Sequence, residues 1–400
     1  MRLAGVPARA LRPDDRAHLR ARRGLAAMSA AMDMAAGMAA IRVFGAVHRY
    51  YQGPGALGLV GQVAASLGRQ PLLVADQIVG ELVFETASAA CRRHGLELRW
   101  LPVRGQVTRA AVQTLLAAAR AGPAPDIVLA AGGGKGVDTG KALARELGAR
   151  LLVLPTAASN DGPCSKAFVY YDDAHCMESV QFLPRNPDAV LVDTDVLVRA
   201  PRALLVSGIG DALCKLYEGA QVRGCGGLNL FGSAGTIAAQ QLSTACERVI
   251  REDAAEGLDA LQGARPTPAF ERLTEALVLL SGLAFENSGL SIAHSLTRGL
   301  PQAAGTETTL HGLHVGYGLL VQFVLEERSA AFMAGQIAFH RSVGLAVNLA
   351  GLGAREVSAR SIGQIARATM RSPHIGHFQR PLSVADLETA MHRLEALAAA

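Results

Sequence analysis

Residues 132–165 constrain the fold of this chain more than any other stretch. Three glycines and Lys135 (132–135) follow one residue after the largely apolar segment 126–130. A helical pattern and a second apolar segment come next, and the stretch ends in the polar loop 156–165. A strand, a glycine turn, a helix and another strand in this order form a βαβ unit with two parallel strands.

The same alternation of strands and helices runs through the first half of the chain. Ligands of parallel sheets bind at the carboxyl ends of the strands, and Asp76, the glycine turn and loop 156–165 all fall at such ends. Thr108 is expected to cap a helix. The expected strands are 41–44, 71–75, 96–103, 126–130, 150–154 and 189–195, and the expected helices are 79–94, 108–121 and 137–147.

Strand signals stop after residue 201, and the remainder has helical patterns. Ser383, followed three residues later by Asp386, is expected to cap the last helix. We therefore predict an α/β nucleotide-binding domain over 41–201 and an all-helical, metal-binding domain over 202–400, with a cleft between them. The expected helices are 202–222, 227–250, 267–286, 290–299, 311–327, 330–350, 355–371 and 384–399.

Composition excludes several kinds of partner. The net charge is +5, but seven arginines precede residue 24, so the remainder is nearly balanced and predicts no nucleic-acid binding. No uncharged apolar run reaches about 18 residues, so no membrane span is expected. The six cysteines form no CxxC pair, which is typical of a reduced, cytoplasmic protein.

Residues 1–40 are predicted to be a disordered extension. The alternative, a targeting peptide, is disfavoured for secretion by Asp14 and Asp15.

The glycine turn has two interpretations. Its glycines could bring the backbone and the start of the next helix close to a pyrophosphate, with Lys135 adding charge. They could instead be needed only to make a tight turn. The GxGxxG and P-loop spacings are both absent, which disfavours ATPase chemistry. Asp138 and Lys141 could form a surface ion pair, and Asp161 could contact a ligand or form a turn.

Three residues of the helical half could bind a metal. Asp211, His294 and His311 supply one carboxylate and two imidazoles, a set that suits zinc with positions left open for substrate. A single histidine in an apolar helix is more often a core residue, and His340, His374 and His377 are assigned to that class. His314 is one turn from His311 and could support a ligand.

Taken together, these pieces resemble glycerol dehydrogenases, within the iron-containing (group III) alcohol dehydrogenase superfamily. The resemblance covers residue 41 to the C-terminus and implies the dehydroquinate synthase-like fold, an α/β domain with a parallel nucleotide-binding sheet followed by an all-α domain. The matching stretches are GGGKGVDTGKALA (132–144), PTAASNDGPCS (155–165), QFLPRNPDAVLVDTDVL (181–197), GIGDALCKLYEGA (208–220), GLSIAHSLTRGL (289–300) and HGLHVGYG (311–318).

The resemblance also implies a site and an assembly. Zinc would be held by Asp211, His294 and His311, and the catalytic residue Asp161 would contact a small-molecule alcohol. Relatives that use iron carry a histidine at the position of Lys215, so this chain favours zinc. A homo-oligomer is expected. The residues implied to surround NAD are Asp76, Gly133, Gly134, Lys135, Asp138, Thr156, Ser159, Ser165, Ala167 and Tyr171.

The chain departs from the family pattern at a few positions. Thr297 and Arg298 stand where His-Asn is usual, and Leu313 stands where Glu is common. Arg298 could bind an anionic substrate group or merely interact with a helix end. The loop sequence Asn160-Asp161-Gly162 is slightly more similar to the corresponding loop of glycerol-1-phosphate dehydrogenases.

We therefore expect NAD-dependent, zinc-assisted oxidation of a small polyol, such as glycerol to dihydroxyacetone. One alternative is a dehydrogenase of an anionic alcohol, either glycerol-1-phosphate or a 2-hydroxy acid. A catalytically silent NAD- or metal-binding protein is a second alternative. A lyase like the sugar-phosphate cyclases is disfavoured, because few basic phosphate ligands accompany Lys215 and Arg298.

Overall fold

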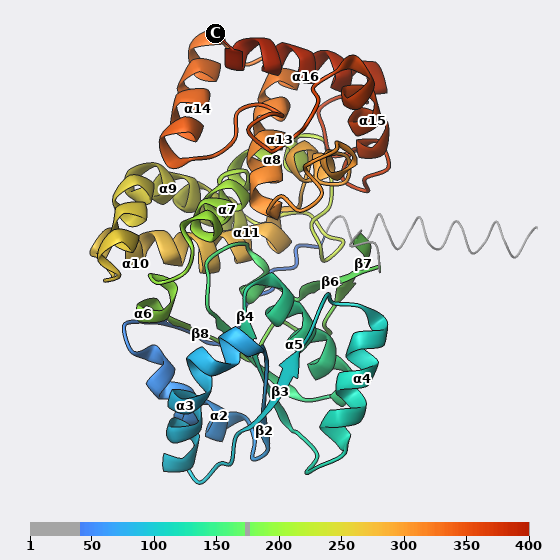
Figure 1. Ribbon diagram of the computed structural model, residues 1–400. Helices are drawn as coiled ribbons and strands as arrows, with labels where there is room; N and C mark the ends of the chain where they lie inside the picture. The colour runs from blue at the N-terminus through green and yellow to red at the C-terminus, as the bar shows by residue number, and fades with distance from the viewer. Residues whose placement is uncertain (1–40, 173–176, 400) are drawn as a thin grey trace, which may run out of the picture.

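The computed structural model describes residues 41–172 and 177–399. The extension predicted over 1–40 lies outside these residues. An α/β region occupies the first half and a helical region the second (Figure 1). This is the predicted arrangement of a parallel sheet followed by helices.

The sheet of the α/β region has six parallel strands in the order β1-β8-β5-β4-β2-β3. Its central strands are almost wholly buried, because helices cover both faces. The strands are β1 (Tyr50–Gly53), β2 (Pro71–Asp76), β3 (Arg99–Val103), β4 (Ile127–Gly132), β5 (Arg150–Pro155) and β8 (Ala189–Asp193). The helices are η1 (Ala56–Leu59), α2 (Val60–Leu67), α3 (Gln77–Arg93), α4 (Arg109–Arg120) and α5 (Gly134–Leu147).

Alternate side chains of each strand enter different hydrophobic cores. Leu73 and Leu129 pack in a core with residues of α2 and α3. Leu72 and Val128 point to the other face and pack with residues of α4 and α5. This second core continues without a break into the helical region, so the two regions pack directly on one another.

The α/β region differs from the prediction in two places. Residues 41–44 are not a strand of the sheet, because their backbone donors bond to the helical region: Val43 N donates to Ser233 Oγ at 3.0 Å. Gly45 N likewise donates to Asn287 Oδ1 at 2.8 Å. An antiparallel hairpin of β6 (Ala167–Tyr171) and β7 (Met177–Phe182) was not predicted. Its strands pair only with each other, outside the main sheet.

In the described residues the helical region adds no further strand. The predicted helix over 202–222 is two helices that meet at Cys214, and the helix predicted over 227–250 starts later, at the Thr236 cap. Ser383 and Asp386 exchange the predicted capping bonds. The elements are α6 (Thr194–Leu197), α7 (Arg202–Leu213), α8 (Lys215–Gly224), α9 (Ile237–Gly263), α10 (Pro268–Glu275), the π-helical turn η3 (Ala276–Leu280), α11 (Ser281–Ser288), α12 (Ile292–Leu296), η4 (Leu300–Gln302), α13 (His311–Leu325), α14 (Ala330–Val343), α15 (Ala359–Thr369) and α16 (Val384–Ala399).

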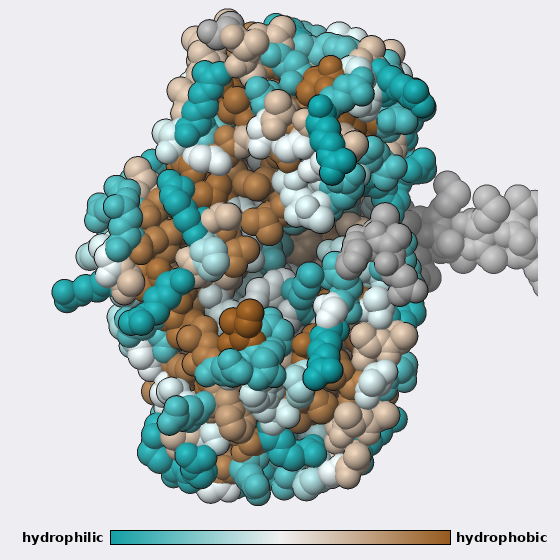
Figure 2. All heavy atoms as spheres, in the orientation of Figure 1, coloured by the Kyte–Doolittle hydropathy of each residue, from teal (hydrophilic) through white to brown (hydrophobic). Residues whose placement is uncertain are grey.

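Within the described ranges, no single helix is long and apolar enough to cross a membrane. One pair, Pro268–Ser288 with Ile292–Gln302, passes that test jointly on length and composition but is bent by 94°. Figure 2 shows that the surface is hollowed where the helical and α/β regions meet.

Candidate functional site

The turn between β4 and α5 lies at the carboxyl edge of the sheet. Gly132 has a φ of 136°, a conformation that favours glycine, so the turn needs glycine for its geometry. The N-cap of α5, Gly133, makes no side-chain cap bond, which leaves the first backbone N–H groups of a long helix for an anion. The two interpretations of this turn are therefore compatible.

Lys141 and Asp138 do not form the surface ion pair considered from sequence. The Lys141 side chain is fully buried, and its Nζ donates to the carbonyls of Gly162 at 2.6 Å and Ala167 at 2.7 Å. Burial lowers the pKa of Lys141. Asp138 Oδ2 accepts from Val169 N at 3.1 Å, and burial raises the pKa of Asp138 to about 6. Both side chains tie α5 to loop 156–165 and strand β6.

The residues predicted for NAD lie at the end of β2, in the glycine turn and α5, in loop 156–165 and on strand β6. Asp76 ends β2 and caps α3 by accepting from Val79 N at 2.9 Å. Thr156 N donates to Gly132 O at 3.1 Å, which joins loop 156–165 to the glycine turn. Lys135 is exposed at the start of α5, Ser159 and Ser165 are buried in the loop, and Ala167 and Tyr171 belong to β6.

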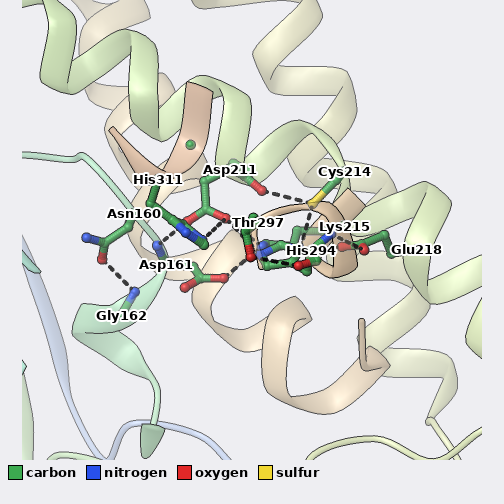
Figure 3. A network of polar contacts seen from close by, with 12 residues as sticks. Asn160, Asp161, Gly162, Asp211, Cys214, Lys215, Glu218, His294, Thr297 and His311 are labelled. Atoms are coloured by element: carbon green, nitrogen blue, oxygen red, sulfur yellow. Dashed lines mark hydrogen bonds and ion pairs between the residues drawn. The ribbon is translucent and has the colours of Figure 1, made fainter. Parts of the chain in front are cut away.

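The three predicted metal ligands come together from three helices. Asp211 Oδ1 on α7 lies 3.3 Å from His294 Nε2 on α12 and 4.0 Å from His311 Nε2 at the start of α13 (Figure 3). All three ligand atoms lie within 4.8 Å of one another. A Cβ on Gly312 would lie 1.7 Å from the Ser207 carbonyl, so glycine there lets α13 approach α7 closely. The set is open on one side, because the His311 side chain is 45% exposed.

The surroundings of His294 fit a bound metal. The Glu218 carboxylate Oε2 lies 2.6 Å from His294 Nδ1, and Oε1 accepts from Ser291 N and His294 N. Burial lowers the pKa of His294, but Glu218 and Asp211 outweigh it and hold that pKa well above its usual value, so a metal would displace the proton on Nε2, which faces Asp211. The proton on Nδ1 would stay with Glu218 and fix the ring orientation. Burial lowers the pKa of His311 to about 4, so His311, unlike His294, is neutral near pH 7. The donor set therefore suits a divalent metal.

Asp161 lies beside this set and is not the turn residue of its loop. The turn bond belongs to Asn160, whose Oδ1 accepts from Gly162 N at 2.9 Å. Asp161 N donates to Asp211 Oδ2 at 2.9 Å, and Asp161 Oδ2 lies 2.7 Å from Lys215 Nζ. Lys215 Nζ also donates to Asp211 Oδ1 at 3.0 Å.

The charged groups of this cluster shift one another's pKa values. Burial raises the pKa of Asp211, but Lys215 and the two histidine ligands outweigh it and hold that pKa well below its usual range. Burial and the Asp211 carboxylate together raise the pKa of Asp161. Burial lowers the pKa of Lys215, but Asp161 and Asp211 more than reverse this, so Lys215 remains a cation.

Sequence reasoning missed Glu218 and the contacts of Lys215. Helical spacing carried a signal, since residues four and seven positions after Asp211 share its helix face. Arg298 Nη1 donates to the Arg371 carbonyl at 3.0 Å, so this side chain contacts the chain just beyond the end of α15. His340 is a core residue as predicted, bonded to Gln336 O and Gly316 O.

Comparisons with known proteins find similar dehydrogenases and reductases. Residues 51–201 match the family described as iron-containing alcohol dehydrogenase. The chain is 36% identical to a glycolaldehyde reductase of Halobacterium salinarum, over 78% of this chain and 85% of that protein. It is 34% identical to a glycerol dehydrogenase of Pseudomonas putida, over 82% of this chain and 90% of that protein.

A solved structure extends the similarity to the fold. The crystal structure of a probable glycerol dehydrogenase from Sinorhizobium meliloti 1021 superposes with a TM-score of 0.84 at 33% identity, covering 90% of this chain and 99% of that chain. The structural match spans nearly the whole described fold, including both the sheet and the helices that carry the predicted metal ligands. The chain therefore belongs to the iron-containing alcohol dehydrogenase superfamily, in its glycerol dehydrogenase branch.

Proposed function

We propose that the chain is an NAD-dependent dehydrogenase that oxidises a small neutral polyol, such as glycerol to dihydroxyacetone. The metal is zinc, held by Asp211, His294 and His311. One observation supports the proposal: the carboxylate of Asp161, from the loop beside the predicted NAD site, lies next to the three predicted metal ligands. The similarity to glycerol dehydrogenases supports the substrate class.

Each group has a part in this reaction. When bound, zinc supplies a Lewis acid that lowers the pKa of an alcohol hydroxyl, and NAD accepts the hydride. Asp161 accepts a hydrogen bond from a second hydroxyl of the substrate. The uncapped start of α5 binds the pyrophosphate of NAD, and Lys141 holds loop 156–165 in place. Glu218 accepts the hydrogen bond from the proton on Nδ1 of His294, which leaves Nε2 as the ligand atom.

Charge at the site favours a neutral substrate over the anionic alternative. Lys215 already contacts two carboxylates, and Arg298, on which the anionic alternative depends, donates to the Arg371 carbonyl. The Asp161 carboxylate would repel a phosphate or a 2-hydroxy acid. The complete ligand set supports an active enzyme rather than a silent binding protein.

A substrate screen tests the proposal. Zinc-loaded protein with NAD should produce NADH from glycerol, 1,2-propanediol or ethylene glycol, and little from glycerol-1-phosphate or lactate. NADH from the anionic substrates alone would replace the proposal with the anionic alternative. Bound zinc with no turnover of any of these compounds would support a silent binding protein.

The division of the chain and its assembly are part of the proposal. We place a domain boundary near residue 201, where the strands end, and propose a cytoplasmic homo-oligomer. The described cysteines are free, as expected in a reducing compartment. Limited proteolysis should cut near the boundary, and light scattering should give a mass above that of one chain.

A further inference from the structure

One buried ammonium group joins the two carboxylates on which the proposed reaction depends. Lys215 Nζ lies 2.7 Å from Asp161 Oδ2 and 3.0 Å from Asp211 Oδ1, and its side chain is only 1% exposed (Figure 3). A buried charge is tolerated when it is paired and hydrogen-bonded, and here both partners are carboxylates. Lys215 therefore ties the loop after β5 to helix α7.

The contact with Lys215 fixes the orientation of the Asp161 carboxylate. Its Oδ2 faces Lys215, and its backbone N–H donates to Asp211 Oδ2 at 2.9 Å, so the residue is held at two points. Apart from this ion pair, Asp161 Oδ2 is buried without a hydrogen-bond partner among the described residues, so the carboxylate has acceptor capacity left for a substrate hydroxyl. The Asp161 side chain is 12% exposed, more than those of Lys215 and Asp211, so it is the member of the cluster that a substrate can reach.

The same ammonium lies beside the metal ligands. Asp211 Oδ1, which accepts from Lys215, is also the oxygen nearest to His294 Nε2 and His311 Nε2. A divalent cation bound there would be repelled by the ammonium at short range in a buried site. Lys215 therefore holds the Asp161 carboxylate in its orientation and, at the same time, weakens metal binding.

Building on the proposed polyol dehydrogenase function, we propose that Lys215 is a positioning residue that sets substrate specificity. It holds Asp161 where the carboxylate accepts a hydrogen bond from a hydroxyl adjacent to the reacting one, and it does so at the expense of metal affinity. An enzyme with this device prefers a vicinal diol to an alcohol with one hydroxyl.

The test compares two secondary alcohols that differ in the adjacent hydroxyl, 1,2-propanediol and 2-propanol. For each variant, kcat/KM with NAD is measured on both, and the zinc Kd is measured by competition with a chelating dye. Lys215→Met keeps the length of the side chain and removes its charge and donors. Arg248→Met, which removes a cation from an exposed pair on α9, is the matched control.

Lys215→Met should lower kcat/KM on the diol by about tenfold to a hundredfold, the usual effect of losing a charged hydrogen bond, and change it on 2-propanol by less than about threefold. Its zinc Kd should fall by at least about tenfold. A merely structural role would instead weaken zinc binding. Asp161→Asn should lose the diol preference too, and the double variant should lose no more than either single variant.

Lys215→Gln keeps N–H donors without the charge, and it provides a second variant if Lys215→Met does not fold. It should bind zinc more tightly than the wild type and retain part of the diol preference. An unchanged or weaker zinc affinity in both variants, a retained full diol preference, or additive losses with Asp161→Asn would overturn the proposal. A wild type that binds zinc but oxidises neither alcohol contradicts the proposed function instead, while the zinc comparison still tests the effect of Lys215 on the metal.

Discussion

Glu218 and His294 form a buried pair in which one carboxylate makes three contacts with a single turn of chain. Its Oε2 lies 2.6 Å from His294 Nδ1, and its Oε1 accepts from the backbone N–H groups of Ser291 and His294. The pair fixes both the ring orientation and the tautomer of a proposed metal ligand. Burial raises the pKa of Glu218, but His294 outweighs this and lowers it to about 2, so the carboxylate is ionised near neutral pH.

Glu218→Gln should weaken zinc binding by about tenfold to a hundredfold, because a neutral amide no longer fixes the proton on Nδ1. Dye competition measures the zinc Kd. Glu247→Gln, which changes a carboxylate of α9 paired with Arg251, is the control and should leave the zinc Kd unchanged. An unaltered zinc Kd in Glu218→Gln would show that this carboxylate does not control how His294 binds the metal.

Lys141→Met should destabilise the protein by about 3 kcal/mol, because the carbonyls of Gly162 and Ala167 lose a buried charged donor. It should also raise the Kd for NAD, since loop 156–165 is no longer tied to α5. Urea unfolding and fluorescence titration measure the two effects. Lys135→Met, at an exposed position, should leave the free energy of unfolding nearly unchanged. Equal stability of the two variants would contradict the role of Lys141.

Asp138→Asn should stabilise the protein at alkaline pH more than at acidic pH. Burial raises the folded-state pKa of Asp138 to about 6, above its unfolded value, despite the opposing effect of Lys141. The folded state therefore binds more protons than the unfolded state between these two values, and the wild type loses stability as pH rises through this window. Asparagine removes this loss.

Urea unfolding at pH 5 and pH 8 measures the difference between Asp138→Asn and the wild type. The free energy of unfolding of the variant, relative to the wild type, should be about 1 kcal/mol higher at pH 8 than at pH 5. The amide oxygen of the introduced asparagine can still accept from Val169 N, so the fold should be retained. A difference that does not vary with pH would rule out an elevated pKa at this position.

Arg298→Ala should not change the ratio of kcat/KM for glycerol to that for glycerol-1-phosphate. Its guanidinium donates to the Arg371 carbonyl, beyond the end of α15, so the expected effect is a small loss of thermal stability. Steady-state kinetics on both substrates and a thermal melt test this. A selective loss of activity on the phosphate would restore Arg298 as an anion-binding residue.

Local patterns in the sequence determined the elements that depend on nearby residues. Apolar segments that alternate with helical patterns predicted the strands β2 to β5. Thr108 caps α4 through its side chain, as expected. The strand predicted over 41–44 was wrong, because Ser233 and Asn287, far away in sequence, take its backbone bonds. The hairpin β6–β7 was missed, since its strands pair outside the main sheet.

By itself, the sequence determined the parallel α/β sheet, the helical region after it and the identity of Asp211, His294 and His311 as candidate ligands. Only the tertiary structure decided that Lys141 is buried and that Lys215 joins Asp161 to Asp211. The physical reason is that periodicity and spacing report which face of an element a residue occupies. The partner of a buried charge depends instead on how elements far apart in the chain pack against each other.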